Sequence, residues 1–113
     1  MHEMSLAENV LQIIEEAAHH QSFTCVKMVW LEIGQLACVE QESLRFCFEV
    51  VTRDSIAQRA RLEIIDIPAV GWCKICTHEV PMITLHDACP QCGSYGLKVL
   101  RGDTLRVKEL EVE

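Results

Sequence analysis

Four cysteines in two Cys-x-x-Cys pairs are the residues of this chain best suited to chemistry. The pairs are Cys73 with Cys76 and Cys89 with Cys92, and twelve residues separate them. Each pair fits a tight turn that directs two thiolates to one point, so two facing pairs form the tetrahedral set of four sulfurs that zinc takes in structural sites. A redox motif needs only one such pair. The spacing therefore predicts a closed, structural zinc site, which indicates a metal but leaves function open.

The N-terminus is a second candidate metal site. The α-amine of Met1, the amide nitrogen of His2 and the His2 imidazole can reach one metal ion together and close two adjacent chelate rings. Three nitrogens in a near-planar array suit Ni(II) or Cu(II), and Glu3, water or a partner's ligand would fill a fourth position. From these residues alone, an exposed histidine without a role is the simpler interpretation of His2.

The other histidines carry little sign of catalysis. His19 and His20 fall at the end of an expected helix, and His78 and His86 lie between the cysteine pairs. We interpret His19 and His20 as interacting favourably with the helix dipole or as simply solvent-exposed, and His78 and His86 as solvated loop positions. The chain has no glycine-rich phosphate loop, no nucleophile elbow and no His-Glu-x-x-His motif. We therefore expect that the protein is not an enzyme.

Composition argues against several other classes of protein. The net charge is −7, and residues 70–100 carry no excess of basic side chains, which argues against nucleic-acid binding. The N-terminus lacks the features of a signal peptide, and no apolar run is long enough to cross a bilayer. We therefore expect a cytoplasmic protein without membrane contact. In that setting Cys25, Cys38 and Cys47 are expected to be free thiols, buried as small hydrophobic residues.

Two helices are predicted from apolar periodicity. Ser5 and Glu8 form a capping box, which predicts a helix from about Leu6 to His19 or His20 after a short tail of residues 1–4. A second helix is predicted at about 41–53, and Glu40 and Glu42 are interpreted as acids at its start. The apolar stripes are Leu6, Val10, Ile13, Ile14 and Ala17 in the first helix, and Leu44, Cys47, Phe48 and Val51 in the second.

Three strands complete the predicted core. Residues 26–33 and 61–67 read as strands that end at Gly34 and Pro68, and a third strand follows Gly102 with a β-bulge near residues 108–109. The fold class is therefore α+β, with two helices on a three-stranded mixed sheet and an inserted zinc-ribbon module. Residues 1–68 plus 101–113 are predicted to form the main domain, and residues 69–100 the zinc-binding module.

The motifs taken together closely resemble the HypA/HybF family of hydrogenase-maturation nickel metallochaperones. The residues that carry this resemblance span the whole chain: Met1-His2-Glu3, the strand Trp30-Leu31-Glu32-Ile33-Gly34, Cys38-Val39-Glu40, the Phe46 and Phe48 pair, the two Cys-x-x-Cys pairs, and the closing segment Gly102–Glu113.

The resemblance implies a nickel metallochaperone that binds Ni(II) at its N-terminus and delivers it to the large-subunit precursor of nickel–iron hydrogenase. It implies His2 as the essential nickel ligand, with Met1 and Glu3 contributing main-chain nitrogens. It also implies structural Zn²⁺ on Cys73, Cys76, Cys89 and Cys92. Residues 1–68 plus 101–113 would then be the nickel-binding domain.

The same resemblance implies partners. These are a GTPase nickel chaperone of the HypB type and the hydrogenase large-subunit precursor, with urease maturation as a further client in some members. A homodimer is also possible. The alternative hypothesis is a zinc-ribbon protein-interaction or nucleic-acid-binding module without a transferable metal.

Overall fold

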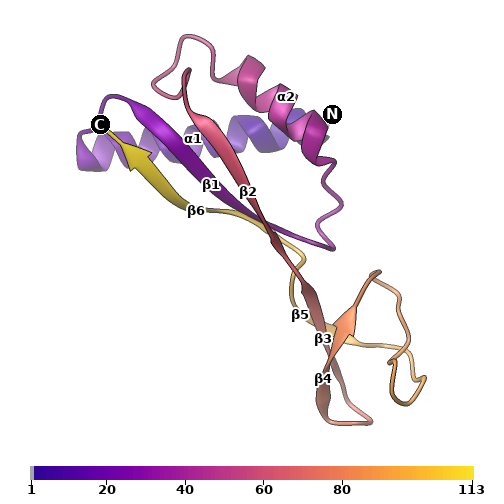
Figure 1. Ribbon diagram of the computed structural model, residues 1–113. Coiled ribbons are helices and arrows are strands. Elements are labelled where there is room, and N and C mark those ends of the chain that lie inside the picture. Colours follow the sequence, from indigo (N-terminus) through magenta and orange to yellow (C-terminus); the bar gives the residue numbers. More distant parts are fainter. Residues whose placement is uncertain (1) are drawn as a thin grey trace. The chain divides into compact units, whose positions relative to one another are not determined.

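The computed structural model describes residues 2–113, so Met1 lies outside the described residues. Two helices and six strands follow one another along the described chain (Figure 1). Their bounds are α1 His2–Gln21, β1 Val26–Gly34, α2 Gln41–Val51, β2 Arg61–Ile67, β3 Ala69–Cys73, β4 His78–Met82, β5 Lys98–Arg101 and β6 Leu105–Val112.

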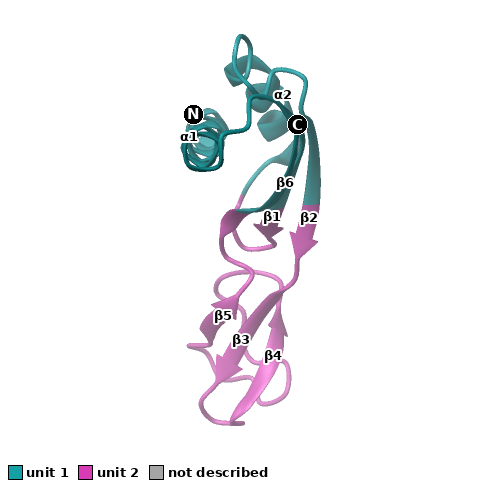
Figure 2. Cartoon of the chain, turned by 90° about the vertical axis from the view of Figure 1, so that its left-hand side faces the viewer, with its two compact units in different colours: residues 1–31, 39–64, 107–113 teal, residues 32–38, 65–106 magenta. Residues whose placement is uncertain are grey.

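The first sheet has the strand order β2-β1-β6. The amide N–H of Gly34 donates to the carbonyl of Thr104, and the N–H of Glu113 donates to the carbonyl of Cys25, so β1 and β6 run antiparallel. The arrows of β1 and β2 point the same way in Figure 2, and that pair is parallel. The predicted α+β class, with two helices, a three-stranded mixed sheet and a module inserted before the last strand, is therefore confirmed.

Helix α1 begins at His2, not at Leu6 as the capping box predicts. The expected short tail is wrong for the described residues 2–4, which already form the first helical turn. Two features stabilise this earlier start. Glu3 places a carboxylate at the positive end of the helix dipole, and its Oε2 accepts a hydrogen bond of 3.3 Å from the N–H of Glu40.

The apolar faces of both helices enter one core with β1. In α1 the buried side chains are Ala7, Val10 and Ile14. Ile13 was predicted to belong to the apolar stripe, but its side chain is 47% exposed and lies outside the core. The stripe of α2 is confirmed at Leu44, Cys47 and Phe48. Val26, Val29 and Leu31 supply the strand side of this core.

Helix α2 is anchored at its start. Glu40 is the N-cap, and its carboxylate accepts from the N–H groups of Glu42 and Ser43 at 3.2 and 3.0 Å, which satisfies two amides that the helix leaves free. The interpretation of Glu40 as a helix-start acid is confirmed. The helix ends at Val51, two residues before the predicted Arg53.

The three additional cysteines differ in burial. Cys47 is buried as predicted, Cys25 is half-buried, and Cys38 is exposed. The prediction that all three are buried hydrophobic residues is therefore wrong for Cys38. Its φ of 57° lies in the left-handed region, in the loop that joins β1 to α2.

The chain divides into two compact units. One comprises residues 1–31, 39–64 and 107–113, and the other residues 32–38 and 65–106 (Figure 2). The division crosses β1, β2 and β6, because each of these strands contributes residues to both units. The predicted domains, 1–68 plus 101–113 and 69–100, stay a prediction, as does the β-bulge in β6. None of the helices described for residues 2–113 is long and apolar enough to cross a membrane.

The second unit carries a small antiparallel sheet of order β4-β3-β5. Gly71 lies opposite Val80, and Cys73 lies opposite His78. The sequence predicted turns in this region but not these short strands, whose apolar alternation is too brief to stand out. The sheet ends at the cysteine-rich turns, so it fixes the place of the first Cys-x-x-Cys pair.

Two glycines, Gly34 at the end of β1 and Gly102 between β5 and β6, approach each other closely. The N–H of Leu36 donates to the carbonyl of Gly102 at 2.7 Å. A Cβ placed on Gly34 would lie 2.2 Å from the carbonyl carbon and oxygen of Gly102, which are backbone atoms that cannot rotate away. Glycine at position 34 is therefore required by this close approach.

We predict that Gly34→Ala lowers the free energy of unfolding by about 3 kcal/mol, because the added methyl group forces backbone atoms apart. Gly96→Ala is the control: its φ is +88° and nothing lies within 4 Å, so only the conformational cost of about 1–2 kcal/mol remains. Urea unfolding followed by circular dichroism measures both values. An equal or smaller loss for Gly34→Ala would contradict the close approach.

Candidate metal centres

The first cysteine pair is held by the turn between β3 and β4. Cys73 is the last residue of β3, and its carbonyl accepts the N–H of Thr77 at 2.8 Å. Thr77 adopts a φ of 56°, which lets the chain reverse into β4. Within the turn the N–H of Cys76 points at the sulfur of Cys73, 3.4 Å away. The turn thus brings both sulfurs to its inner side.

The second pair is held by a similar turn. The carbonyl of Cys89 accepts the N–H of Gly93 at 2.8 Å, and the N–H of Cys89 donates to the carbonyl of Ser94 at 2.8 Å. Gly93 has a φ of +77°, a conformation that glycine adopts without strain. This turn is closed by two backbone hydrogen bonds around the cysteine pair.

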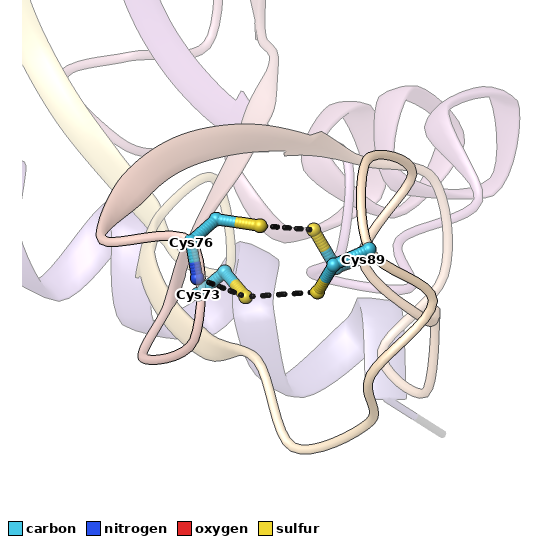
Figure 3. A group of neighbouring side chains, drawn as sticks. Cys73, Cys76 and Cys89 are labelled. Atoms are coloured by element: carbon cyan, nitrogen blue, oxygen red, sulfur yellow. Dashed lines mark hydrogen bonds between the residues drawn. The ribbon is translucent and has the colours of Figure 1, made fainter.

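The four sulfur atoms converge on one point. Cys73, Cys76, Cys89 and Cys92 each offer a sulfur within 4.8 Å of the others. The Sγ–Sγ distance is 3.7 Å between Cys73 and Cys92, and 3.9 Å between Cys76 and Cys89. Figure 3 shows the labelled side chains of Cys73, Cys76 and Cys89 pointing toward one another. Zn–S bonds of about 2.3 Å in a tetrahedron place sulfurs about 3.8 Å apart. The donor set therefore fits a zinc ion.

Burial differs across the four ligands. Cys73 and Cys89 are buried and Cys76 is half-buried, whereas Cys92 is exposed. The buried pair packs with Val80 and Leu97 in a cluster that has only three fully buried members. One corner of the site therefore faces solvent, while the opposite side rests on a very small apolar core.

The surroundings of the four thiols shift their pKa values in different directions. The N–H of Cys76 and the hydroxyl of Ser94 lower the pKa of Cys73 to about 6. The Ser94 hydroxyl and backbone also lower the pKa of Cys92. The neighbouring Cys92 and burial raise the pKa of Cys76 to about 12. Four sulfurs this close cannot all carry charge by themselves, and a divalent cation is the group that would allow it.

His2 and Glu3 lie in the first turn of α1. The His2 side chain is exposed, and its Nδ1 lies 3.4 Å from Oε2 of Glu3. The same carboxylate oxygen accepts the N–H of Glu40, which is the largest cause of the lowered pKa of Glu3. The first amides of a helix have no intrahelical acceptor, so the main-chain nitrogens of His2 and Glu3 are not committed to helix hydrogen bonds.

The structure brings together the four cysteines and, separately, His2 with Glu3. The cysteines belong to the second unit and His2 and Glu3 to the first. Met1, the third expected contributor to the N-terminal site, is outside the described residues. The remaining histidines are exposed, as expected: His19, His20, His78 and His86.

Two residues at these sites were not identified as site residues from the sequence. Glu40 contacts Glu3 through its main-chain N–H, which no sequence pattern reveals. Ser94 lies 2.9 Å from the sulfur of Cys92. Its position two residues after the last ligand was the only available signal.

Comparisons with known proteins bear on function. The family model described as "Hydrogenase/urease nickel incorporation, metallochaperone, hypA" matches residues 1–112. The chain is 62% identical over 113 residues to hydrogenase maturation factor HypA of Azotobacter chroococcum mcd 1, covering all of both chains. It is 59% identical to HypA of Azotobacter vinelandii, again over the full length of both.

This chain belongs to the HypA family. The resemblance stated from the sequence is thereby confirmed, and the chain is a member of a nickel-incorporation metallochaperone family of hydrogenase maturation. The solution structure of the Ni metallochaperone HypA from Helicobacter pylori matches with a TM-score of 0.75 over 97% of this chain and 96% of that one. At 24% identity, that likeness shows the HypA fold alone. A second solution structure of a HypA protein gives a TM-score of 0.74 at 25% identity, covering 100% of this chain and 97% of that one.

We predict that zinc binding to the metal-free protein at pH 7 releases fewer protons than the four thiols hold. Cys76, with a pKa of about 12, must give up a proton on binding, whereas Cys73, with a pKa of about 6, is already mostly ionised. Proton release should therefore increase, and zinc affinity fall, as the pH drops through about 6. Calorimetry in buffers of different ionisation enthalpy counts the protons. Zinc-loaded protein is the control, and release of one proton per thiol at pH 7 would contradict the charge distribution.

Proposed function

We propose that this chain is a nickel carrier that binds Ni(II) at its N-terminus and delivers it for insertion into the hydrogenase large subunit. The observation that carries the proposal is the first turn of α1. It presents the exposed imidazole of His2 beside main-chain nitrogens that have no helical acceptor, in a member of a nickel-incorporation family. Exposure suits a carrier, because a partner must reach the ion to remove it.

In the proposed ligand set, His2 provides its imidazole and its amide nitrogen, Met1 its α-amine, and Glu3 its main-chain nitrogen. Nitrogen donors in a near-planar array match the tetragonal preference of Ni(II). The Glu3 carboxylate already accepts the Glu40 N–H, so it fixes the first turn of α1 against the loop that starts α2. Glu3 would thus serve the site through its main chain while its side chain holds the turn in place.

The four cysteines are proposed to hold a structural Zn²⁺ in the module of residues 69–100. Support comes from the sulfur spacing and from the absence of any nitrogen or oxygen donor in the cluster found among residues 2–113. Zinc would supply the positive charge that lets four neighbouring thiolates coexist. The nickel-binding domain is proposed to comprise residues 1–68 plus 101–113.

The partners proposed are those of hydrogenase maturation. A GTPase nickel chaperone of the HypB type would cooperate in delivery, the hydrogenase large-subunit precursor would receive nickel, and urease maturation would be a further client. A homodimer is compatible with this role. The proposed carrier is cytoplasmic and not an enzyme, and it does not bind nucleic acid. The charges of the second unit support the last point, with Lys74, Lys98, Arg101 and Arg106 against Glu32, Asp66, Glu79, Asp87 and Asp103.

A zinc-ribbon interaction module without transferable metal is the second candidate function. It is favoured by large apolar side chains exposed on the cysteine module: Ile75 at 73%, Ile83 at 74% and Tyr95 at 81%. Such exposed apolar side chains often mark protein contacts. The two functions differ in what they require, because only the carrier needs a free α-amine and one Ni(II) per chain.

We predict that one extra residue before Met1 lowers nickel affinity at least about tenfold, or about 1.4 kcal/mol. The extension converts the α-amine into an amide and shifts the chelate. The added residue precedes a helix end, so thermal stability without nickel should not change. Calorimetry with Ni(II) on both proteins measures the difference. Equal affinities would contradict the amine as a ligand, and His2 would then have to bind nickel together with side chains elsewhere.

We predict that the two metal sites are independent. His2→Ala should abolish tight nickel binding and leave one zinc per chain, whereas Cys73→Ala should lose zinc and preserve α1 and α2. His19→Ala is the matched control, since it removes an exposed imidazole from the other end of the same helix. Elemental analysis and nickel titration decide between the outcomes. Loss of zinc in His2→Ala, or unchanged zinc in Cys73→Ala, would contradict separate sites.

A further inference from the structure

Ser94 contacts three of the four cysteines of the zinc site proposed above. Its hydroxyl oxygen lies 2.9 Å from Sγ of Cys92 and 3.5 Å from Sγ of Cys73. Its carbonyl oxygen accepts the backbone N–H of Cys89 at 2.8 Å. Side-chain and main-chain atoms of one residue therefore contact both Cys-x-x-Cys pairs.

The shorter distance identifies the acceptor. A serine hydroxyl has one proton to donate, and a thiolate in a metal site has none, so the hydrogen bond must run from Ser94 to sulfur. At 2.9 Å the Cys92 sulfur is the closer acceptor, and Cys73 already receives the N–H of Cys76 at 3.4 Å. Each of these two thiolates thus has a donor of its own.

Cys92 is the ligand that most needs such a donor. It is the exposed member of the set, whereas Cys73 and Cys89 are buried. Water and competing chelators reach the site first at this corner. Four thiolates around one Zn²⁺ also leave an excess of negative charge, which hydrogen-bond donors offset.

We propose that Ser94 is a positioning residue of the zinc site: its hydroxyl holds the exposed Cys92 thiolate in the ligand set and thereby limits the rate at which zinc leaves. This inference rests on the proposed zinc site. It concerns the Ser94 hydroxyl alone, because the hydrogen bond from Cys89 to the Ser94 carbonyl is made by the main chain and is retained with any residue at this position.

The test compares Ser94→Ala and Ser94→Thr in the full chain loaded with zinc. Ser94→Ala should speed zinc transfer to an excess of a chromogenic chelator about tenfold, the low end of the range for removing an outer-sphere partner of a metal ligand. Ser94→Thr keeps a hydroxyl and should transfer zinc within about twofold of the unmodified chain on the same scale.

Thr77→Ala is the matched control. Its hydroxyl lies in the other cysteine turn but donates its proton to the carbonyl of Cys76 at 2.6 Å, so that proton is not directed at a sulfur. Removing it should leave the zinc-transfer rate unchanged. A rate increase in Thr77→Ala equal to that in Ser94→Ala would overturn the proposal, because any lost hydroxyl would then act alike.

A spectroscopic readout separates the hydrogen bond from a general loosening of the turn. In the Co(II)-substituted protein, losing a donor to sulfur raises the energy of the sulfur lone pairs and moves the sulfur-to-cobalt charge-transfer band to lower energy. Ser94→Ala should show this shift, and Ser94→Thr and Thr77→Ala should not. An unshifted band with an unchanged transfer rate in Ser94→Ala would overturn the proposal.

The unmodified chain is measured first, which keeps the two proposals distinguishable. If it binds neither zinc nor cobalt at one per chain, the zinc site itself is wrong. If it binds and Ser94→Ala does not bind at all, Ser94→Thr decides: restored binding supports the role of the hydroxyl, and failure to restore it overturns that role.

Discussion

The mutual repulsion of four closely placed sulfurs is the constraint on which the second unit depends. Sulfur atoms within 4.8 Å of one another cannot all be thiolates without a cation between them. The turns that bring them together rest on a cluster with three fully buried members, Cys73, Val80 and Cys89, and two of these are themselves ligands of the proposed site. Such a core is too small to oppose the repulsion by apolar burial, so the sheet β4-β3-β5 and the metal would have to stabilise each other.

Hydrogen-bond donors distribute the charge around that cluster. The N–H of Cys76 points at Cys73, and the hydroxyl of Ser94 points chiefly at Cys92. Cys76 has the opposite environment, with burial and a neighbouring sulfur raising its pKa to about 12. The site is therefore asymmetric in both charge and exposure, and its buried side and its exposed corner should differ in how readily they release a metal.

The N-terminal site depends on a different interaction, the contact between Glu3 and Glu40. Two carboxylate residues lie together here because the Glu40 main-chain N–H, and not its carboxylate, faces Glu3. The Glu40 carboxylate is occupied with Ser43 and Glu42 at the start of α2. His2 is thereby attached to an ordered helical turn while its imidazole stays exposed. In the proposed function, nitrogen donors in one unit and sulfur donors in the other would match metals of different preference, which would be the chemical basis for separating a cargo from a structural ion.

The features that sequence analysis predicted correctly are those whose physical cause lies within a few neighbouring residues. Cys-x-x-Cys spacing fixed which sulfurs can converge, because the turn geometry lies within four residues. Periodicity placed α2 and the strand 61–67, and the alternation of β-forming residues placed β1 to within one residue. The family followed from motifs distributed over the whole chain, and the comparisons confirmed it.

The features that sequence analysis missed depend on contacts between residues far apart in the chain. The start of α1 moved from Leu6 to His2 because Glu3 meets Glu40, which is thirty-seven residues away, and a local capping signal cannot report that contact. The exposure of Ile13 and Cys38 depended on which neighbours cover each face. The strands of the cysteine module were too short for periodicity to identify. The role proposed for Ser94 rests on a contact of its hydroxyl with the Cys92 sulfur that only the fold creates.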